Sequence, residues 1–422
     1  MTVRQRPFLL ALTASAVLSA ASLFAQNTTS LKHTLVLDDL ESPWDMAFLD
    51  DGTMFYTEKC KGLSVRMPSG ETKAILGMGG VDGFNSNADD LFCEGQAGMM
   101  GVAVDPNFEG NRRIYVYSTS NLVTPHTNRL MRLEVSEDFS SVSGRTDIVD
   151  DVPYKMAASD HPFGGPGAHN GGRVRFNPGD GYLYLTTGDT HNGKVPQSPT
   201  MMGSKVIRID TDGSPAAGNT PPVGFDKRTY TYGHRNVQGI AFHPATGTPI
   251  TAEHGPWHSD EITVLRNGGN AGWDPRPNMA GRGDCPDEYC GYSPNQGVGD
   301  NRFSRASWMP MTDFNTYPSA MAPIWNNNGW SQGTSSAAFL EGAAWGDWDG
   351  AMVVGIMGIG FGGTPLGQRI DIIELSDDGT EVLDVTEMTL PMDPGRFRSL
   401  VLGPDGSLYA AIDEGMIHKL TP

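Results

Sequence analysis

A short turn-and-strand pattern recurs six times along this chain of 422 residues. Each unit has an Asp-Gly or Pro turn, an apolar strand, a loop, and a second strand that ends in another turn. Radial repetition of such small sheets predicts an all-β fold, a six-bladed β-propeller of four-stranded antiparallel blades. The units begin with DDGTMFYTE (50–58), DPNFEGNRRIYVYST (105–119), NPGDGYLYLTTGD (177–189), HPATGTPITAEHG (243–255), GDWDGAMVVGIMG (346–358) and GPDGSLYAAIDEG (403–415).

Other all-β architectures fit this pattern less well. Uneven spacing of the units disfavours a parallel β-helix, and six similar units disfavour a single two-sheet sandwich. The spacing also implies loops of very different length, which is where binding groups usually lie. Because no Pro/Ser-rich or highly charged linker interrupts the pattern, residues 26–422 are predicted to form one domain.

The N-terminal segment predicts export. Arg4 and Arg6 precede an apolar run that ends at Phe24, and Ala25 offers a small residue for cleavage. A membrane anchor is the alternative, but the run is short for a spanning helix. Residues 1–25 are therefore predicted to be a signal peptide, and the protein to be periplasmic or secreted.

The charge of the chain is strongly acidic. The formal net charge is -19, and removing the two arginines of segment 1–25, which has no acidic residue, leaves -21. Such acidity argues against nucleic acid as a partner. It is compatible with a bound cation.

The four cysteines suit an oxidising compartment. The short loop in CPDEYC favours a local Cys285–Cys290 disulfide, which leaves Cys60 to pair with Cys93. A zinc site is the alternative, but the chain lacks paired C-x-x-C motifs.

Two stretches concentrate polar side chains beside predicted strands. In GPGAHNGGRVRF (165–176), His169 stands among small residues, and the following strand ends at Asp189. A carboxylate that orients an imidazole fixes its tautomer and raises its basicity, whereas the structural alternative is a histidine bonded to a turn. In YGHRNVQG (232–239), Arg235 suits a carboxylate or phosphate ligand, and the alternative is a polar turn.

A third stretch, TAEHGPWHSDEITVLRNGGNAGWD (251–274), combines acidic residues with a Gly-Pro turn. Calcium binds carboxylate and backbone carbonyl oxygens, so this stretch is a candidate calcium site; a solvated acidic loop is the alternative, and no third zinc ligand is evident. Near the C-terminus, Arg396 and Arg398 share one face of a predicted strand. Their charges repel unless an anion lies between them or the pair is solvated.

Taken together, these stretches resemble the soluble PQQ-dependent aldose sugar dehydrogenases, the glucose/sorbosone dehydrogenase family. Seven matching motifs occur in the same order and cover nearly all of the chain after the signal segment. They are PWDMAFLDDGTMFYTE, GQAGMMGVAVDPNFEGNRRIYVYST, HNGGRVRFNPGDGYLYLTTGD, YGHRNVQGIAFHP, EHGPWHSDEI, GGNAGWD and GRFRSLVLGPDGSLY. The family fold is a six-bladed propeller, as the six units independently predict.

The resemblance implies a reaction and its cofactors. The anomeric hydroxyl of an aldose would be oxidised to a lactone by hydride transfer to calcium-bound PQQ, and the electrons would pass to an acceptor such as a cytochrome or quinone. His169 matches the general base, and Gln96 in GQAG matches a glutamine near the sugar. Arg235 and Asn236 match cofactor contacts, and His254 stands where members carry Gln or His.

The resemblance also implies where ions and cofactor carboxylates are bound. The matching pairs are Gly255 and Pro256, whose carbonyls would hold calcium; Asp260 and Glu261, near a structural calcium; and Arg396 and Arg398, which would grip PQQ carboxylates.

One departure concerns a cation. The family pattern has a lysine in the fifth blade against a cofactor carboxylate, but no lysine occurs here from Arg228 to His418, and Arg369 is the candidate substitute. The segment 283–303 is also particular to this chain and could reshape the pocket. Two alternative functions therefore stay open: a cofactor-free propeller that binds a glycan or an exported protein, and a calcium-dependent lactonase.

Overall fold

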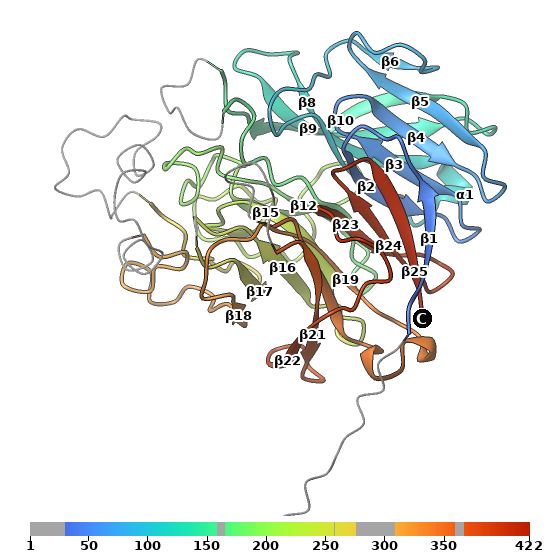
Figure 1. The fold of residues 1–422 in the computed structure, drawn as a ribbon. Coiled ribbons are helices and arrows are strands. Elements are labelled where there is room, and N and C mark those ends of the chain that lie inside the picture. The colour runs from blue at the N-terminus through green and yellow to red at the C-terminus, as the bar shows by residue number, and fades with distance from the viewer. Residues whose placement is uncertain (1–29, 158–164, 257, 276–308, 359–366) are drawn as a thin grey trace, which may run out of the picture.

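The computed structural model describes residues 30–157, 165–256, 258–275, 309–358 and 367–422. Within these residues the strands form six sheets arranged as the blades of a propeller (Figure 1). The predicted fold, six antiparallel four-stranded blades, is confirmed. Blade 1 has a short fifth strand, β6, which pairs in parallel with β5.

The strands are assigned to the blades in chain order, except that β1 belongs to the last blade. Blade 1 contains β2 (Pro43–Phe48), β3 (Met54–Glu58), β4 (Gly62–Arg66), β5 (Thr72–Met78) and β6 (Asn87–Ala88). Blade 2 contains β7 (Met99–Val104), β8 (Arg113–Ser120), β9 (Thr127–Val135) and β10 (Val142–Pro153). Blade 3 contains β11 (Val174–Phe176), β12 (Leu183–Thr186), β13 (Lys205–Ile209) and β14 (Thr229–Tyr232).

The remaining blades follow the same plan. Blade 4 contains β15 (Val237–Phe242), β16 (Pro249–Glu253), β17 (Glu261–Val264) and β18 (Trp325–Asn326). Blade 5 contains β19 (Thr334–Phe339), β20 (Met352–Ile356), β21 (Arg369–Leu375) and β22 (Val382–Glu387). Blade 6 contains β23 (Phe397–Leu402), β24 (Leu408–Ile412), β25 (Met416–Thr421) and β1 (Lys32–Leu37). The helical segments within the described residues are α1 (Phe108–Asn111) and a 3₁₀ helix (Ala343–Trp348).

The ring closes through a strand from each end of the propeller. β1 pairs antiparallel with β25, with Thr34 opposite Lys419 and Leu35 opposite His418 (Figure 1). The first strand thus completes the last blade and joins the two ends of the ring, while each blade keeps its own short edge strands.

The six sequence units correspond to the second and third strands of the six blades. These strands read as nearly continuous apolar runs because neighbouring blades cover both faces of the sheet. For example, every residue of β12 and β13 is buried.

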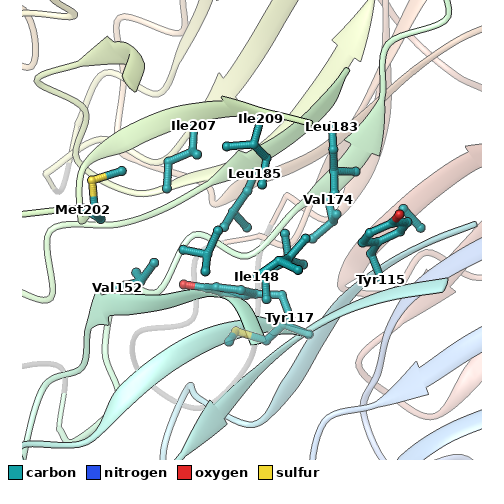
Figure 2. Packing of buried hydrophobic residues seen from close by; sticks show 14 of the residues in the cluster. Tyr115, Tyr117, Ile148, Val152, Val174, Leu183, Leu185, Met202, Ile207 and Ile209 are labelled. Atoms are coloured by element: carbon teal, nitrogen blue, oxygen red, sulfur yellow. The ribbon is translucent and has the colours of Figure 1, made fainter. Parts of the chain in front are cut away.

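Hydrophobic clusters lie between successive blades. Between blades 2 and 3, Tyr117 and Ile148 face Leu185, Ile207 and their neighbours (Figure 2). Complete burial of one such aliphatic side chain contributes about 1.5–3 kcal/mol. The repeated interblade packing therefore holds the ring rigid around its axis.

The predicted Cys60–Cys93 disulfide is confirmed. It joins the loop after β3 to the segment that precedes β7 and thereby ties blade 1 to blade 2. The predicted Cys285–Cys290 pair, the signal segment 1–25 and the distinctive segment 283–303 lie outside the described residues. Among the helices that the structure does describe, none has the length and apolar character of a membrane span.

Candidate active site

His169 lies on a glycine-rich loop that precedes β11. Its backbone has a φ of 54°, in the left-handed region, and Gly171 with a φ of 64° follows two residues later. A Cβ on Gly171 would lie 2.6 Å from the carbonyl oxygen of Thr186, so this position requires glycine. The close approach brings the His169 loop against the loop that follows β12.

Asp189, in the loop that follows β12, orients the His169 ring. Its Oδ1 lies 2.7 Å from Nδ1 of His169, and its Oδ2 accepts a 2.8 Å hydrogen bond from the indole Nε1 of Trp273. An ionised carboxylate can only accept, so Nδ1 of His169 carries the proton. The lone pair of the imidazole is then on Nε2, the atom that a general base needs.

Arg235 confirms this tautomer independently. Its NH2 lies 3.2 Å from Nε2 of His169, and its NH1 donates to the carbonyl of His254 at 3.0 Å. Because a guanidinium only donates, Nε2 of His169 must be the acceptor. Arg235 is 8% exposed, and its Nε has no hydrogen-bond partner among the described residues.

Glu253 holds the turn that presents Arg235. Its Oε1 accepts the backbone N–H groups of Arg235 and Asn236, and its Oε2 lies 3.0 Å from Nδ1 of His234. Oδ1 of Asn236 accepts a 3.0 Å hydrogen bond from the N–H of Gly171. The stretch 232–239 is therefore both a braced turn and a part of the site, with Arg235 as its charged group nearest His169.

Arg396 and Arg398 share a carboxylate from their own blade. Arg398 donates to Oδ1 of Asp413 at 2.8 Å and to Oδ2 at 2.7 Å, and Nε of Arg396 lies 3.2 Å from Oδ2. Burial alone would raise the pKa of Asp413, but the two guanidinium groups hold it below its usual value. NH1 of Arg398 also donates to Oε1 of Gln238, which links the pair to the turn that carries Arg235.

Lys59 brings a further cation to this end of the ring. Its Nζ donates to the carbonyl of Gly95 at 2.8 Å, next to Gln96, whose Oε1 accepts the backbone N–H of His169 at 3.2 Å. Burial, with the nearby charge of Arg398, lowers the pKa of Lys59. Lys59 thus lies within electrostatic reach of the paired arginines.

The acidic loop after β16 is braced by its own carboxylate. Asp260 accepts from the backbone N–H of Gly255 at 2.9 Å and, on its other oxygen, from Gln332 and Thr334. A Cβ on Gly255 would lie 1.8 Å from the carbonyl oxygen of His258, so this turn also requires glycine. Pro256 follows directly.

His254 and Glu261 are both held in their neutral forms. Burial, supported by the charges of Arg235, Arg398 and Arg396, lowers the pKa of His254 to about 3. Its Nε2 has no hydrogen-bond partner among the described residues. Burial and the opposite Glu253 raise the pKa of Glu261 to about 8.

The described residues contain no group of three or more His, Cys, Asp or Glu side chains arranged to hold a metal ion. The predicted calcium at Gly255 and Pro256 would use backbone carbonyls, so that prediction remains open. Arg369, the predicted substitute cation, is engaged by Asp371 at 2.7 Å and by Gln332 at 2.5 Å.

The model of one protein family, described as Glucose / Sorbosone dehydrogenase, matches residues 40–419. The chain belongs to this family. Aldose sugar dehydrogenase YliI of Escherichia coli is 26% identical to it over 412 residues, which cover 96% of each chain. Quinoprotein glucose dehydrogenase B of Acinetobacter calcoaceticus is 30% identical over 305 residues, covering 66% of this chain and 60% of the relative.

Two solved structures of proteins named aldose sugar dehydrogenase share the fold. The soluble aldose sugar dehydrogenase of Escherichia coli, in its apo form, aligns with a TM-score of 0.69 at 22% identity, covering 93% of this chain and all of that one. The PQQ-bound aldose sugar dehydrogenase of Streptomyces coelicolor aligns with a TM-score of 0.65 at 22% identity, covering 93% and 98%.

Several residues of this family member's site escape sequence reasoning. They are Lys59, His191, Trp273 and Asp413. Each touches the site from a segment whose local sequence reads as a strand end or loop. For Asp413 a signal did exist: two arginines on one face require an anion, and a carboxylate follows the next strand.

Proposed function

We propose that this protein oxidises the anomeric hydroxyl of aldose sugars to lactones, with PQQ as the bound cofactor and calcium as its partner ion. One observation carries the proposal: His169 presents an unprotonated Nε2 that is oriented by Asp189 and lies 3.2 Å from Arg235. The names of the relatives, a quinoprotein glucose dehydrogenase and a PQQ-bound aldose sugar dehydrogenase, support the same reaction class.

The residues present fit PQQ, which is a triacid. Arg235, Arg396, Arg398 and Lys59 bring positive charge to one end of the ring, where Asp413 offsets only part of it. Guanidinium groups suit planar carboxylates. Buried polar atoms that lack partners among the described residues, Nε of Arg235 and Nε2 of His254, fit a ligand that brings acceptors and donors.

Calcium would be held by backbone oxygens. Gly255 and Pro256 would offer their carbonyls from a turn fixed by Asp260. Asp260 and Glu261 are candidates near a second ion, and Glu261, which is neutral in the ion-free protein, would have to lose its proton there. When bound, PQQ supplies the two-electron acceptor for the hydride, and calcium acts as a Lewis acid on it.

The protein's own groups handle the proton. Nε2 of His169 accepts the hydroxyl proton of the sugar, and the charge of Asp189 stabilises the imidazolium that results. The Trp273 indole holds Asp189 in place through the other carboxylate oxygen. Gln96, which is exposed and contacts the backbone of His169, stands where the sugar would enter.

The disulfide and the N-terminal segment support an exported location. A Cys60–Cys93 bond suits an oxidising environment, as does the signal-like sequence of residues 1–25. We place the protein in the periplasm or outside the cell, with a cytochrome or quinone as the electron acceptor.

Titration of PQQ into the purified apo protein by calorimetry, with and without calcium, tests the proposal directly. Oxidation of a panel of aldoses with a dye acceptor should then depend on both additions. Failure to bind PQQ would contradict the proposal and favour a glycan- or protein-binding propeller. Hydrolysis of lactones without PQQ would favour the lactonase instead.

A further inference from the structure

His191 contacts the proposed base directly. Its Nε2 lies 2.8 Å from Nε2 of His169, and the two rings meet edge to face with centroids 3.8 Å apart and an interplanar angle of 79°. His191 is only 6% exposed. Its place is set by its backbone, because its N–H donates to Oδ1 of Asp189 and its φ is 56°.

The protonation of His169 determines which of the two rings donates the hydrogen bond between them. Nδ1 of His169 holds its proton against Asp189, so Nε2 of His169 has a lone pair and no proton. Two imidazole nitrogens at 2.8 Å need a proton between them. That proton must therefore belong to His191, whose Nε2–H donates to His169.

A neutral imidazole nitrogen has one lone pair. His191 directs its N–H at the lone pair that the sugar hydroxyl needs, and Arg235 approaches the same atom at 3.2 Å. A hydroxyl that gives its proton to Nε2 of His169 must therefore take the place of His191.

We propose that His191 is a positioning residue that caps the base in the substrate-free protein and is exchanged for the reacting hydroxyl when the sugar binds. The cap keeps Nε2 of His169 unprotonated and aimed into the site. This inference rests on the proposed sugar oxidation for its kinetic consequences, but the cap itself is a property of the apo protein.

Two measurable effects on His169 distinguish a capping role of His191 from a purely structural role. The hydrogen bond from His191 stabilises neutral His169, so its loss should raise the pKa of His169 in the free protein. In the sugar complex the bond is already broken, so the pKa there should not move. Among the described residues, the charged groups near the pair are Asp189, Arg235 and, beside Asp189, Lys155, and the variant leaves all three unchanged.

The kinetic test compares His191→Phe with the wild type and with His191→Gln. Phenylalanine keeps a ring but has no N–H, whereas glutamine keeps a donor. His191→Phe should lower KM for the aldose about threefold to tenfold, the weight of one ordinary hydrogen bond, with kcat within about twofold. The acidic limb of kcat/KM should move to higher pH while that of kcat stays in place.

His191→Gln should restore much of the wild-type KM and pH profile. His33→Phe, a ring substitution on β1, is the matched control and should leave both unchanged. A loss of kcat at unchanged KM in His191→Phe would overturn the cap, because His191 would then act in the chemical step. An unmoved acidic limb of kcat/KM would overturn it as well.

The cap can also be measured in the apo protein, where no sugar is oxidised. Nitrogen-15 NMR of the apo protein reports the tautomer and titration of the His169 ring. In the wild type Nε2 should remain unprotonated to a lower pH than in His191→Phe. Equal titration of His169 in the two proteins would overturn the cap even if the protein oxidises aldoses; a clear difference would support it even if no aldose is oxidised.

Discussion

Arg173 and Asp45 form a buried ion pair that connects all six blades at the axis of the propeller. NH1 of Arg173, next to β11, lies 2.5 Å from Oδ1 of Asp45 on β2, and Oδ2 of Asp45 accepts from the N–H of Val102 on β7. The same guanidinium donates to blades 4, 5 and 6 through Gln238, Ser335, Arg398 and Ser399. Burial alone would raise the pKa of Asp45, but Arg173 and Arg175 hold it below its usual value.

Asp45→Asn should therefore destabilise the protein by about 3–5 kcal/mol, because it leaves a buried guanidinium uncompensated. Urea unfolding measures the loss. Arg228→Met is the control, since Arg228 pairs with Asp151 and Asp226 near the surface and should cost about 0–1 kcal/mol. Equal losses of unfolding free energy in the two variants would show that the axial ion pair contributes no more to stability than a surface ion pair.

His169→Asn should lower kcat about 10²- to 10⁴-fold, because it removes the proton acceptor. PQQ affinity should stay within about threefold of the wild type, since the charged groups that suit the cofactor remain. Steady-state kinetics and calorimetric titration of PQQ measure the two quantities. An equal loss of turnover and PQQ binding would contradict the role of His169 as the base.

Most of the fold is predictable from the sequence because the second and third strands of each blade are buried on both faces and bounded by turn residues. The shorter outer strands, such as β18, cannot be predicted in this way, because they form by pairing with an adjacent strand and lack a clear apolar pattern of their own. In the site, His169 and Asp189 stand in recognisable local motifs. Lys59 does not, because its importance comes from approaching Arg398 from another blade. Asp413 is signalled only indirectly, because it follows β24 and meets Arg398 on the paired strand β23.

Lys59→Gln should weaken PQQ binding roughly twofold to fivefold, because one partly exposed cation is lost from the group around Arg398. The difference should shrink at high ionic strength, since salt screens exposed charges. Lys73→Gln is the control, because Lys73 lies on β5 near Glu71 and away from the site. If both variants bind PQQ as the wild type does, Lys59 does not compensate for the lysine missing from blade 5.

Removal of calcium should weaken PQQ binding about tenfold or more, with partial loss of thermal stability in the PQQ-loaded protein. Titration of PQQ in the presence of a calcium chelator tests this. Magnesium should not restore affinity, because it binds backbone carbonyl turns poorly and keeps its water ligands. Unchanged PQQ binding in the chelator would remove calcium from the proposed site.

The seam that closes the ring should weaken at acidic pH. Nε2 of His33 on β1 lies 2.8 Å from Nδ1 of His418 on β25, and burial together with His33 lowers the pKa of His418 to about 4. The folded protein therefore binds fewer protons than the unfolded chain between about pH 6.5 and 4. Stability from this group is fully present above pH 6.5 and is lost as pH falls through 4.

His418→Phe should flatten this part of the stability curve, because it removes the titrating group from the seam while keeping a ring. Between pH 7 and pH 4, the free energy of unfolding measured with urea should fall by about 1 kcal/mol less in the variant than in the wild type. His126→Phe, a ring on the loop between β8 and β9, is the control and should keep the wild-type slope. β1 and β25 close the ring, so acid should open this seam first. Between pH 6.5 and 4, amide hydrogen exchange should therefore rise in β1 before it rises in β12. An equal rise in both strands would contradict a weak seam.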